Sequence, residues 1–294
     1  MIQEAIEFTV AGTKVRGFVH LPEGVEKANL PLIVMGNGFA TEWQFGTRTT
    51  IEAFTELGCA TLNFDYRSFG ISDGEPRQVV DTQGQLEDWR AALRFAQSLE
   101  WVDQSKIIIW GSSLGGGHAI SMAAEFPACA LIAQVPHCCS RAAFKQVSMG
   151  SVVKGMSKAI RDNIGSLFGK APLTVPVVEV PEKYGVMNHA GWKAAYLKLA
   201  ADSTTWKNAI PARSLLKAGD YRPILVADKV QCPALLVAGK KDSGVPFSAV
   251  EETVGKMPNG RLYAYDGDHF DVYQGELYPQ ILQAELDFIR EQIV

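Results

Sequence analysis

One short segment of the sequence carries a side chain that could act as a nucleophile. Gly111-Ser112-Ser113-Leu114-Gly115 follows the apolar run Ile107–Trp110 and precedes a stretch compatible with a helix. In the pattern G-x-S-x-G, the serine sits on a strained turn between a strand and a helix, and the residues two before and two after it must lack side chains. This spacing selects Ser113 rather than Ser112. Because roughly one chain in ten of this composition contains such a match by chance, the position between strand and helix carries the inference.

A serine hydroxyl becomes a strong nucleophile when a base removes its proton and a carboxylate orients that base. Of the five histidines, His269 lies in the turn between the last predicted strand and the closing helix, on the same sheet edge as Ser113. Asp242 follows the end of the preceding strand, whereas the competing strand end is followed by no nearby acidic residue. The chain order Ser113, Asp242, His269 predicts a catalytic triad. The carboxylates of Asp268 and Asp271 are expected to be solvated or to cap the next helix.

A second glycine-rich turn, Gly36-Asn37-Gly38-Phe39-Ala40-Thr41, admits two interpretations. It could bind a dinucleotide, but the sixth position is Thr41, where that fingerprint requires Gly or Ala for close packing of helix on strand. Alternatively, it could help to stabilise an oxyanion, which needs two backbone N–H donors. We expect those donors to be Phe39 and Leu114, the residue after the nucleophile.

Alternating apolar and helical segments predict an α/β fold. Strands are expected at Ala5–Val10, Lys14–His20, Leu32–Met35, Cys59–Asp65, Lys106–Trp110, Ala130–Val135, Ala234–Ala238 and Arg261–Tyr265. Helices are expected at Thr41–Leu57, at Asp88–Ser98 and at the end of the chain. The first two strands predict an antiparallel hairpin, and the apolar later strands predict a mostly parallel sheet with helices on both faces.

Residues 141–221 contain no clear buried strand, and this gap divides the chain. We predict one core, formed by residues 1–140 and 222–294, and a helical cap of residues 141–221 inserted before the last two strands. Two amphipathic helices are expected in this cap. An apolar substrate pocket is predicted from His137, Met156, Trp192 and Tyr196, with further apolar side chains supplied by Met149, Leu167 and Phe168.

Taken together, these motifs resemble the α/β-hydrolase superfamily over the whole chain. The segment from Asp65 to Gly74, D-x-R-x-x-G-x-S-x-G, is similar to that of dienelactone-hydrolase-like and peptidase-S9-like serine esterases and thioesterases. The resemblance implies a Ser-His-Asp hydrolase with a helical lid, no cofactor and a small acyl ester or thioester as substrate. Asn37 stands where many members have His, and Ser113 stands where true dienelactone hydrolases have Cys.

Composition argues against several other classes of protein. The 294-residue chain has 47% hydrophobic and 20% charged residues and a net charge of −4, which argues against a nucleic-acid surface. No secretory signal, membrane-length apolar run or metal-ligand spacing is found, and five cysteines without C-x-x-C fit a reducing cytoplasm. A non-catalytic ligand-binding protein, a peptidase and an NAD-binding oxidoreductase stay open as weaker alternatives, and so does a homodimer.

Overall fold

A mixed sheet of eight strands forms the centre of the molecule. The structure is a computed structural model and describes residues 1–145 and 147–293. The strand order is β1-β2-β4-β3-β5-β6-β9-β10. The strands are β1 (Ile2–Val10), β2 (Thr13–Leu21), β3 (Leu30–Gly36), β4 (Ala60–Phe64), β5 (Val102–Ser112), β6 (Ala130–Gln134), β9 (Ala234–Gly239) and β10 (Gly260–Tyr265). Strands β1, β2 and β4 pair antiparallel and the remaining neighbours pair parallel, as the sequence predicts.

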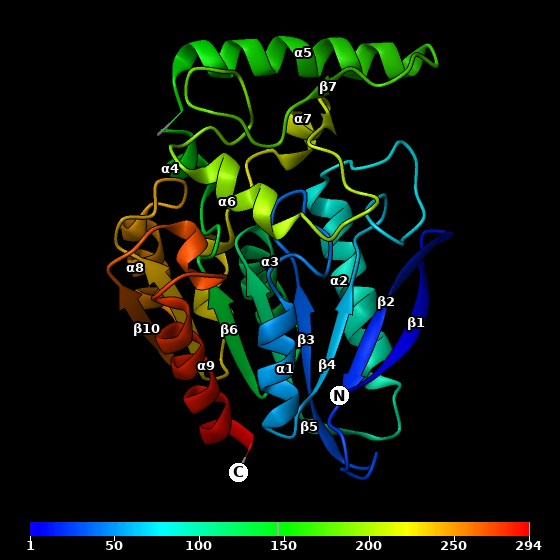
Figure 1. Cartoon of the computed structure of the whole chain (residues 1–294), viewed down its shortest axis with the longest axis vertical. Helices are drawn as coiled ribbons and strands as arrows, with labels where there is room; N and C mark the ends of the chain where they lie inside the picture. The colour runs from blue at the N-terminus through cyan, green and yellow to red at the C-terminus, as the bar shows by residue number, and fades with distance from the viewer. Residues whose placement is uncertain (146, 294) are drawn as a thin grey trace.

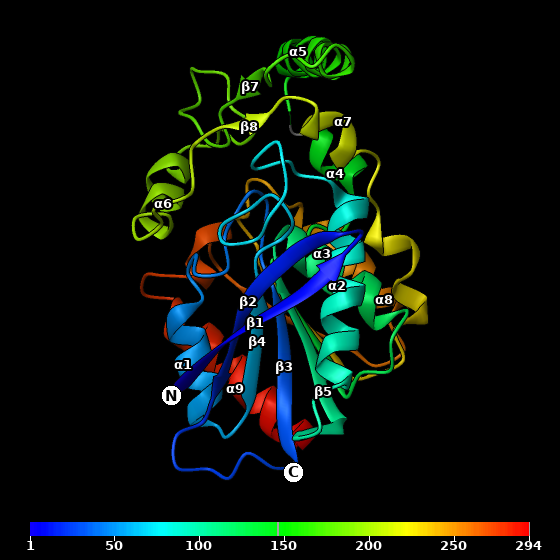
Figure 2. The ribbon, with the colours of Figure 1, turned by 90° about the vertical axis from the view of Figure 1, so that its right-hand side faces the viewer.

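Helices cover both faces of this sheet (Figure 2). On one face lie α1 (Arg48–Glu56) and α9 (Tyr278–Ile293), and on the other lie α2 (Thr82–Gln97), α3 (Leu114–Ala123) and α8 (Phe247–Lys256). Each face has its own apolar core of fully buried side chains. Burial on both faces explains why β3, β6, β9 and the Ile107–Trp110 part of β5 consist of largely apolar runs instead of alternating ones.

Two helices differ from the sequence prediction in where they begin. The helix expected at Thr41–Leu57 begins only at Arg48, because the preceding residues form turns and Gly46 adopts a φ of +67°, which a helix excludes. The helix expected from Asp88 begins earlier, at Thr82. The Asp81 carboxylate caps this end by accepting a hydrogen bond from the Gly84 N–H.

The segment between β6 and β9 lies over the carboxyl edge of the sheet (Figure 1). It contains α4 (Ser140–Phe144), α5 (Met149–Leu167), α6 (Trp192–Leu199), α7 (Ser214–Ala218), a two-stranded sheet of β7 (Thr174–Val175) and β8 (Ile210–Pro211), and the 3-10 turns η1 (Pro223–Leu225) and η2 (Ala227–Lys229). We refer to residues 141–221 as the cap segment. A buried ion pair joins α5 to a later part of the same segment. Both carboxylate oxygens of Asp162 on α5 accept hydrogen bonds from the Arg213 guanidinium.

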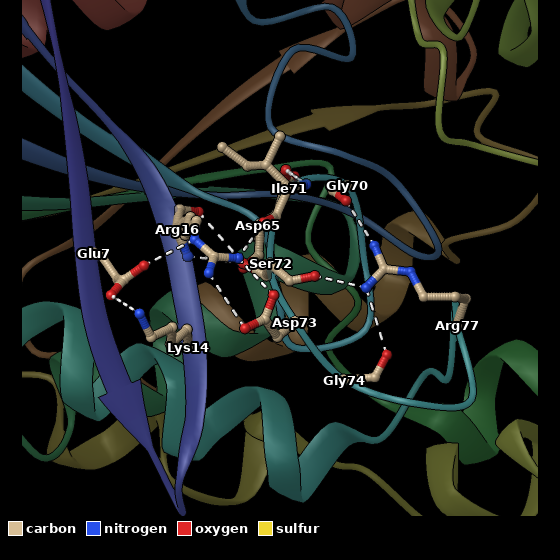
Figure 3. Close-up of polar contacts among 10 residues, drawn as sticks. All are labelled: Glu7, Lys14, Arg16, Asp65, Gly70, Ile71, Ser72, Asp73, Gly74 and Arg77. Atoms are coloured by element: carbon tan, nitrogen blue, oxygen red, sulfur yellow. Dashed lines mark hydrogen bonds and ion pairs between the residues drawn. The ribbon is translucent and has the colours of Figure 1, made fainter.

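A network of buried and partly buried hydrogen bonds holds the loop after β4 in place (Figure 3). The Asp65 carboxylate accepts hydrogen bonds from the Ile71 and Trp43 N–H groups, and burial raises its pKa to about 7. The Ser72 hydroxyl donates to the Asp65 carbonyl, and Arg77 donates to the carbonyls of Gly70 and Ser72. Since Trp43 lies just after the Gly36–Thr41 turn, this network also supports the neighbouring loop of the site.

Within the described residues, no helix is long and apolar enough to cross a bilayer.

Candidate active site

Ser113 sits on a sharp turn between β5 and α3. Its backbone φ of +56° and ψ of −118° lie in a region that residues with a side chain rarely adopt, so the surrounding packing must hold this conformation. A Cβ on Gly111 would lie 2.1 Å from the Gly115 carbonyl oxygen, and one on Gly115 would lie 2.4 Å from the carbonyl oxygens of Gly36 and Asn37. The two glycines are therefore required because the turn packs on itself and on the loop after β3.

The structure brings the three predicted catalytic side chains into one chain of contacts. His269 Nε2 lies 3.1 Å from Ser113 Oγ, and His269 Nδ1 lies 2.7 Å from Asp242 Oδ2. His269 begins the 3-10 turn η3 (His269–Val272) and is buried, while the other carboxylate oxygen of Asp242 accepts hydrogen bonds from the N–H groups of Gly244 and Val245. This geometry allows a proton to move from the serine hydroxyl to the imidazole while Asp242 orients the ring.

Asp268, expected only to cap or to be solvated, joins three segments around the base. It caps η3, and one of its oxygens accepts hydrogen bonds from the N–H groups of His269 at 2.8 Å and Ser243 at 2.9 Å. Its other oxygen accepts a hydrogen bond from the Trp192 indole at 3.0 Å. Asp268 therefore links the loop that carries the base to the loop that carries the acid and to the cap segment.

The loop after β3, which carries the predicted oxyanion donor Phe39, lies beside the nucleophile turn. The Gly38 carbonyl accepts a hydrogen bond from the Thr41 hydroxyl at 3.1 Å. Because the N–H and C=O of a trans peptide point in opposite directions, this bond directs the Phe39 N–H away from Thr41. A Cβ on Gly38 would lie 3.2 Å from the Ser113 Cβ, so there is little room for a side chain between the loop and the nucleophile. The Asn37 side chain ties the loop to the Phe64 carbonyl through a long contact of 3.4 Å.

The second predicted oxyanion donor, Leu114, is the first residue of α3, where the backbone N–H groups have no acceptor within the helix. Both Phe39 and Leu114 line the cavity that contains Ser113 and His269. Tyr196, predicted from the sequence as a pocket residue, donates its hydroxyl to the carbonyls of Phe39 and Ala40 at 2.9 Å each. The cap segment therefore holds the loop that carries Phe39, the other predicted oxyanion donor.

A cavity of about 240 Å³ extends from Ser113 between the core and the cap segment. The predicted pocket residues His137, Met156 and Trp192 line it, and most of the other lining side chains are apolar or aromatic. A second cavity of about 30 Å³ also reaches Ser113 and His269, and Tyr196 lines this smaller one. The smaller cavity is large enough for a water molecule.

Three apolar side chains that were expected to build the pocket do not line either cavity. Met149, Leu167 and Phe168 are 75%, 79% and 74% exposed and lie at the two ends of α5. The sequence predicts a helix here, and α5 confirms it, but the apolar side chains whose spacing indicated the helix, Met156, Ile160, Ile164 and Leu167, are 41% to 79% exposed. The buried face of this helix, however, carries Gly155, Ala159 and Asp162, which let α5 approach the rest of the cap segment closely.

One of the two other histidines that line the larger cavity, His137, is neutral at neutral pH. Burial, together with the nearby His269, lowers the pKa of His137 to about 4. Its backbone N–H donates to the Ser113 carbonyl, and its Nε2 lies 2.9 Å from the Ser140 hydroxyl. His137 thus supports the nucleophile turn through its backbone and offers the cavity an uncharged ring.

A buried polar network lies beneath the nucleophile turn and had no signal in the sequence. Ser112 donates its hydroxyl to the Gln134 side chain, and the Gln134 amide donates to Glu285 on α9. The Trp110 indole also donates to Glu285, at 3.0 Å. Burial raises the pKa of this carboxyl to about 7.

Within residues 1–145 and 147–293, no group of three or more His, Cys, Asp or Glu side chains is placed to hold a metal ion. The Gly36–Thr41 turn, considered above as a dinucleotide loop, packs instead against Ser113 and Gly115.

Comparison with known proteins identifies a family. The family model described as "Serine aminopeptidase, S33" matches residues 28–269. The chain is 31% identical over 286 residues to the quorum-quenching protein AidA of Acinetobacter baumannii, which covers 97% of this chain and 93% of that protein. It is 26% identical over 307 residues to the thiohydrolase aneE of Aspergillus aculeatus, covering 97% and 92% of the two chains. The solved structure of DcsB in complex with its substrate analogue superposes with a TM-score of 0.86 at 25% identity, covering 99% of each chain.

Proposed function

Because the chain belongs to the S33 family of α/β-hydrolases, we propose that it cleaves a carboxylic ester or thioester through an acyl-Ser113 intermediate. The observation that carries this proposal is the continuous set of contacts from Ser113 through His269 to Asp242 at the mouth of an apolar cavity. The narrower resemblance to dienelactone-hydrolase-like and peptidase-S9-like esterases stays a prediction.

In the first half of the reaction, Ser113 Oγ attacks the acyl carbonyl carbon and His269 Nε2 takes the hydroxyl proton. The backbone N–H groups of Phe39 and Leu114 stabilise the oxyanion that forms. When the tetrahedral intermediate collapses, the bond from carbon to the leaving oxygen or sulfur breaks, and His269 returns the proton to that atom. In the second half, His269 takes a proton from the water molecule that attacks the acyl carbon. The bond from that carbon to Ser113 Oγ then breaks, His269 returns the proton to Oγ, and the acid is released.

The cavity supports an uncharged acyl group as substrate. Its lining is mostly apolar, and one of its histidines, His137, is held neutral by burial. Thiohydrolase aneE is named for thioester-type chemistry, which supports a thioester as well as an ester for this chain. An alcohol or amine in place of the deacylating water would make the same acyl-enzyme a transferase.

An aminopeptidase, the activity named in the family description, has less support. Such an enzyme must bind the ammonium group of a peptide N-terminus, for which a carboxylate is the natural partner. Among the described residues that line the two cavities there is no Asp or Glu. Peptide amides should therefore be poor substrates compared with aryl esters or thioesters of the same acyl group.

The decisive experiment is intact-mass analysis after treatment with a fluorophosphonate, in which Ser113 Oγ attacks phosphorus and fluoride leaves. One adduct on the wild-type protein and none on Ser113→Ala would establish an activated serine at this turn. A Ser112→Ala variant is the matched control because it removes the neighbouring hydroxyl, and it should still be labelled. Absence of an adduct on folded wild-type protein would refute the proposal in favour of a non-catalytic ligand-binding protein.

A further inference from the structure

One aromatic side chain of the cap segment touches the catalytic base directly. The Trp192 indole stacks on the His269 imidazole, with ring centroids 4.9 Å apart and an angle of 29° between the planes. Trp192 is the first residue of α6 and is only 3% exposed. We propose that Trp192 is a positioning residue for His269, so that the seating of the cap segment determines how well the base is aligned. This inference rests on the proposed serine hydrolase function.

The two hydrogen bonds of the imidazole leave one degree of freedom unfixed. His269 is held at Nδ1 by Asp242 and at Nε2 by Ser113, and both contacts lie at the edge of the ring. Tilting the ring about the line through these nitrogens would disturb neither contact at first. A flat side chain stacked on one face opposes this tilt. The indole is therefore placed to supply the constraint that the triad contacts lack.

Trp192 is also fixed to the two loops that carry the acid and the base. Its indole N–H donates to Asp268, which in turn accepts hydrogen bonds from the backbone of His269 and Ser243. A Cβ on Gly244 would lie 2.0 Å from the indole Cη2 and 2.9 Å from each neighbouring ring atom, so the edge of the ring points at the backbone whose N–H donates to Asp242. The same ring thus contacts the base, the loop of the acid and the carboxylate that joins them.

Neighbouring rings hold Trp192 rigidly in this place. Phe270 meets it edge-on at 5.3 Å, and His189 lies against it at 4.6 Å between centroids. A ring that is clamped on several sides can transmit the position of α6 to the imidazole. A small displacement of α6 would therefore act on the proton transfer, even for a substrate too short to touch the cap segment.

The test separates this role from the simpler one, in which Trp192 is a wall of the acyl cavity. We would measure kcat and KM of wild type, Trp192→Phe and Trp192→Leu with p-nitrophenyl acetate and p-nitrophenyl octanoate. If Trp192 positions the base, Trp192→Leu lowers kcat by roughly 10- to 100-fold with both esters and leaves KM within about threefold. Trp192→Phe keeps a ring over the imidazole and should lose less than about fivefold in kcat.

Two outcomes would overturn the inference. Trp192→Leu with a raised KM for the octanoate and an unchanged kcat for the acetate would make Trp192 a cavity wall. Equal losses in the Phe and Leu variants would show that the stacked ring is not the contact that matters. Trp101→Leu is the matched control, because Trp101 lies next to the opposite end of β5 and packs against the core far from Ser113. Labelling of the wild type by a fluorophosphonate is scored first, so that failure of the proposed function is recognised separately.

Discussion

A buried carboxyl group beneath the nucleophile turn makes the stability of the protein depend on pH. Glu285 has no exposed surface, and its hydrogen-bond partners in the described part of the chain are the neutral side chains of Trp110 and Gln134. Removal from water disfavours the charged carboxylate, and two neutral donors compensate only in part. Burial accordingly raises the pKa of Glu285 from 4.5 to about 7 in the folded protein.

The direction of the effect follows from proton binding. Below pH 4.5, Glu285 is protonated in both states and adds no pH dependence. Between about pH 4.5 and 7, the unfolded chain has released the proton and the folded protein still holds it, so the free energy of unfolding falls as pH rises. A raised pKa of this size corresponds to a loss of about 3 kcal/mol across that interval. Above pH 7 both states are ionised and the loss is constant.

The perturbation is Glu285→Gln, compared with wild type by urea unfolding at several values between pH 5 and 8. Asp65 and Asp88 are also buried, with pKa values raised by burial to about 7 and about 6, so the difference between wild type and variant is the informative quantity. Relative to wild type, the variant should gain about 2 to 3 kcal/mol in free energy of unfolding from pH 5 to pH 8. Glu251→Gln removes an exposed carboxylate on α8 and is the matched control. A pH-independent difference between wild type and Glu285→Gln would refute the reasoning.

Three further substitutions test the parts of the site. Gly115→Ala places a methyl group 2.4 Å from two backbone oxygens and should abolish fluorophosphonate labelling, whereas Gly150→Ala on α5, where no atom lies within 4 Å, should leave labelling unchanged. Tyr196→Phe removes the donor to two carbonyls of the oxyanion loop and should lower kcat about tenfold with little change in KM, as steady-state kinetics would show. Asp162→Ala leaves the Arg213 guanidinium without its buried partner; it should destabilise the cap segment by about 3 kcal/mol and expose it to limited proteolysis, with Ser166→Ala on the exposed end of α5 as control.

The nucleophile turn could be predicted because its constraints are local in the chain. The left-handed backbone of Ser113 and the close approach of Gly111 and Gly115 require residue types that leave a visible five-residue pattern. The buried parallel strands are equally visible, because burial on both faces removes polar residues from them. His269 and Asp242 could be selected because parallel strands place their carboxyl ends along one edge of the sheet.

The environment of the base could not be predicted in the same way. Trp192 and Tyr196 are one helical turn apart and face the interior, a spacing that only indicates a buried helix face. Nothing in that pattern distinguishes a ring stacked on His269 from a ring that packs against other apolar side chains. The predicted start of α1 was wrong for a related reason. The turns of residues 41–47 depend on tertiary contacts, such as the hydrogen bond from the Trp43 N–H to Asp65.

The absence of a side chain at Gly244 reflects the contact between the cap segment and the loop that carries Asp242. Gly244 does not need its flexibility for a left-handed turn, because its φ is not among the positive values of the chain. Glycine is required there because the Trp192 indole occupies the space of a Cβ. The two residues are therefore one structural unit divided between the core and the cap segment. A substitution at either position should disturb the same imidazole, and Trp192→Leu should relieve the steric cost of Gly244→Ala. If Trp192→Leu leaves the cost of Gly244→Ala unchanged, the two residues do not form one unit.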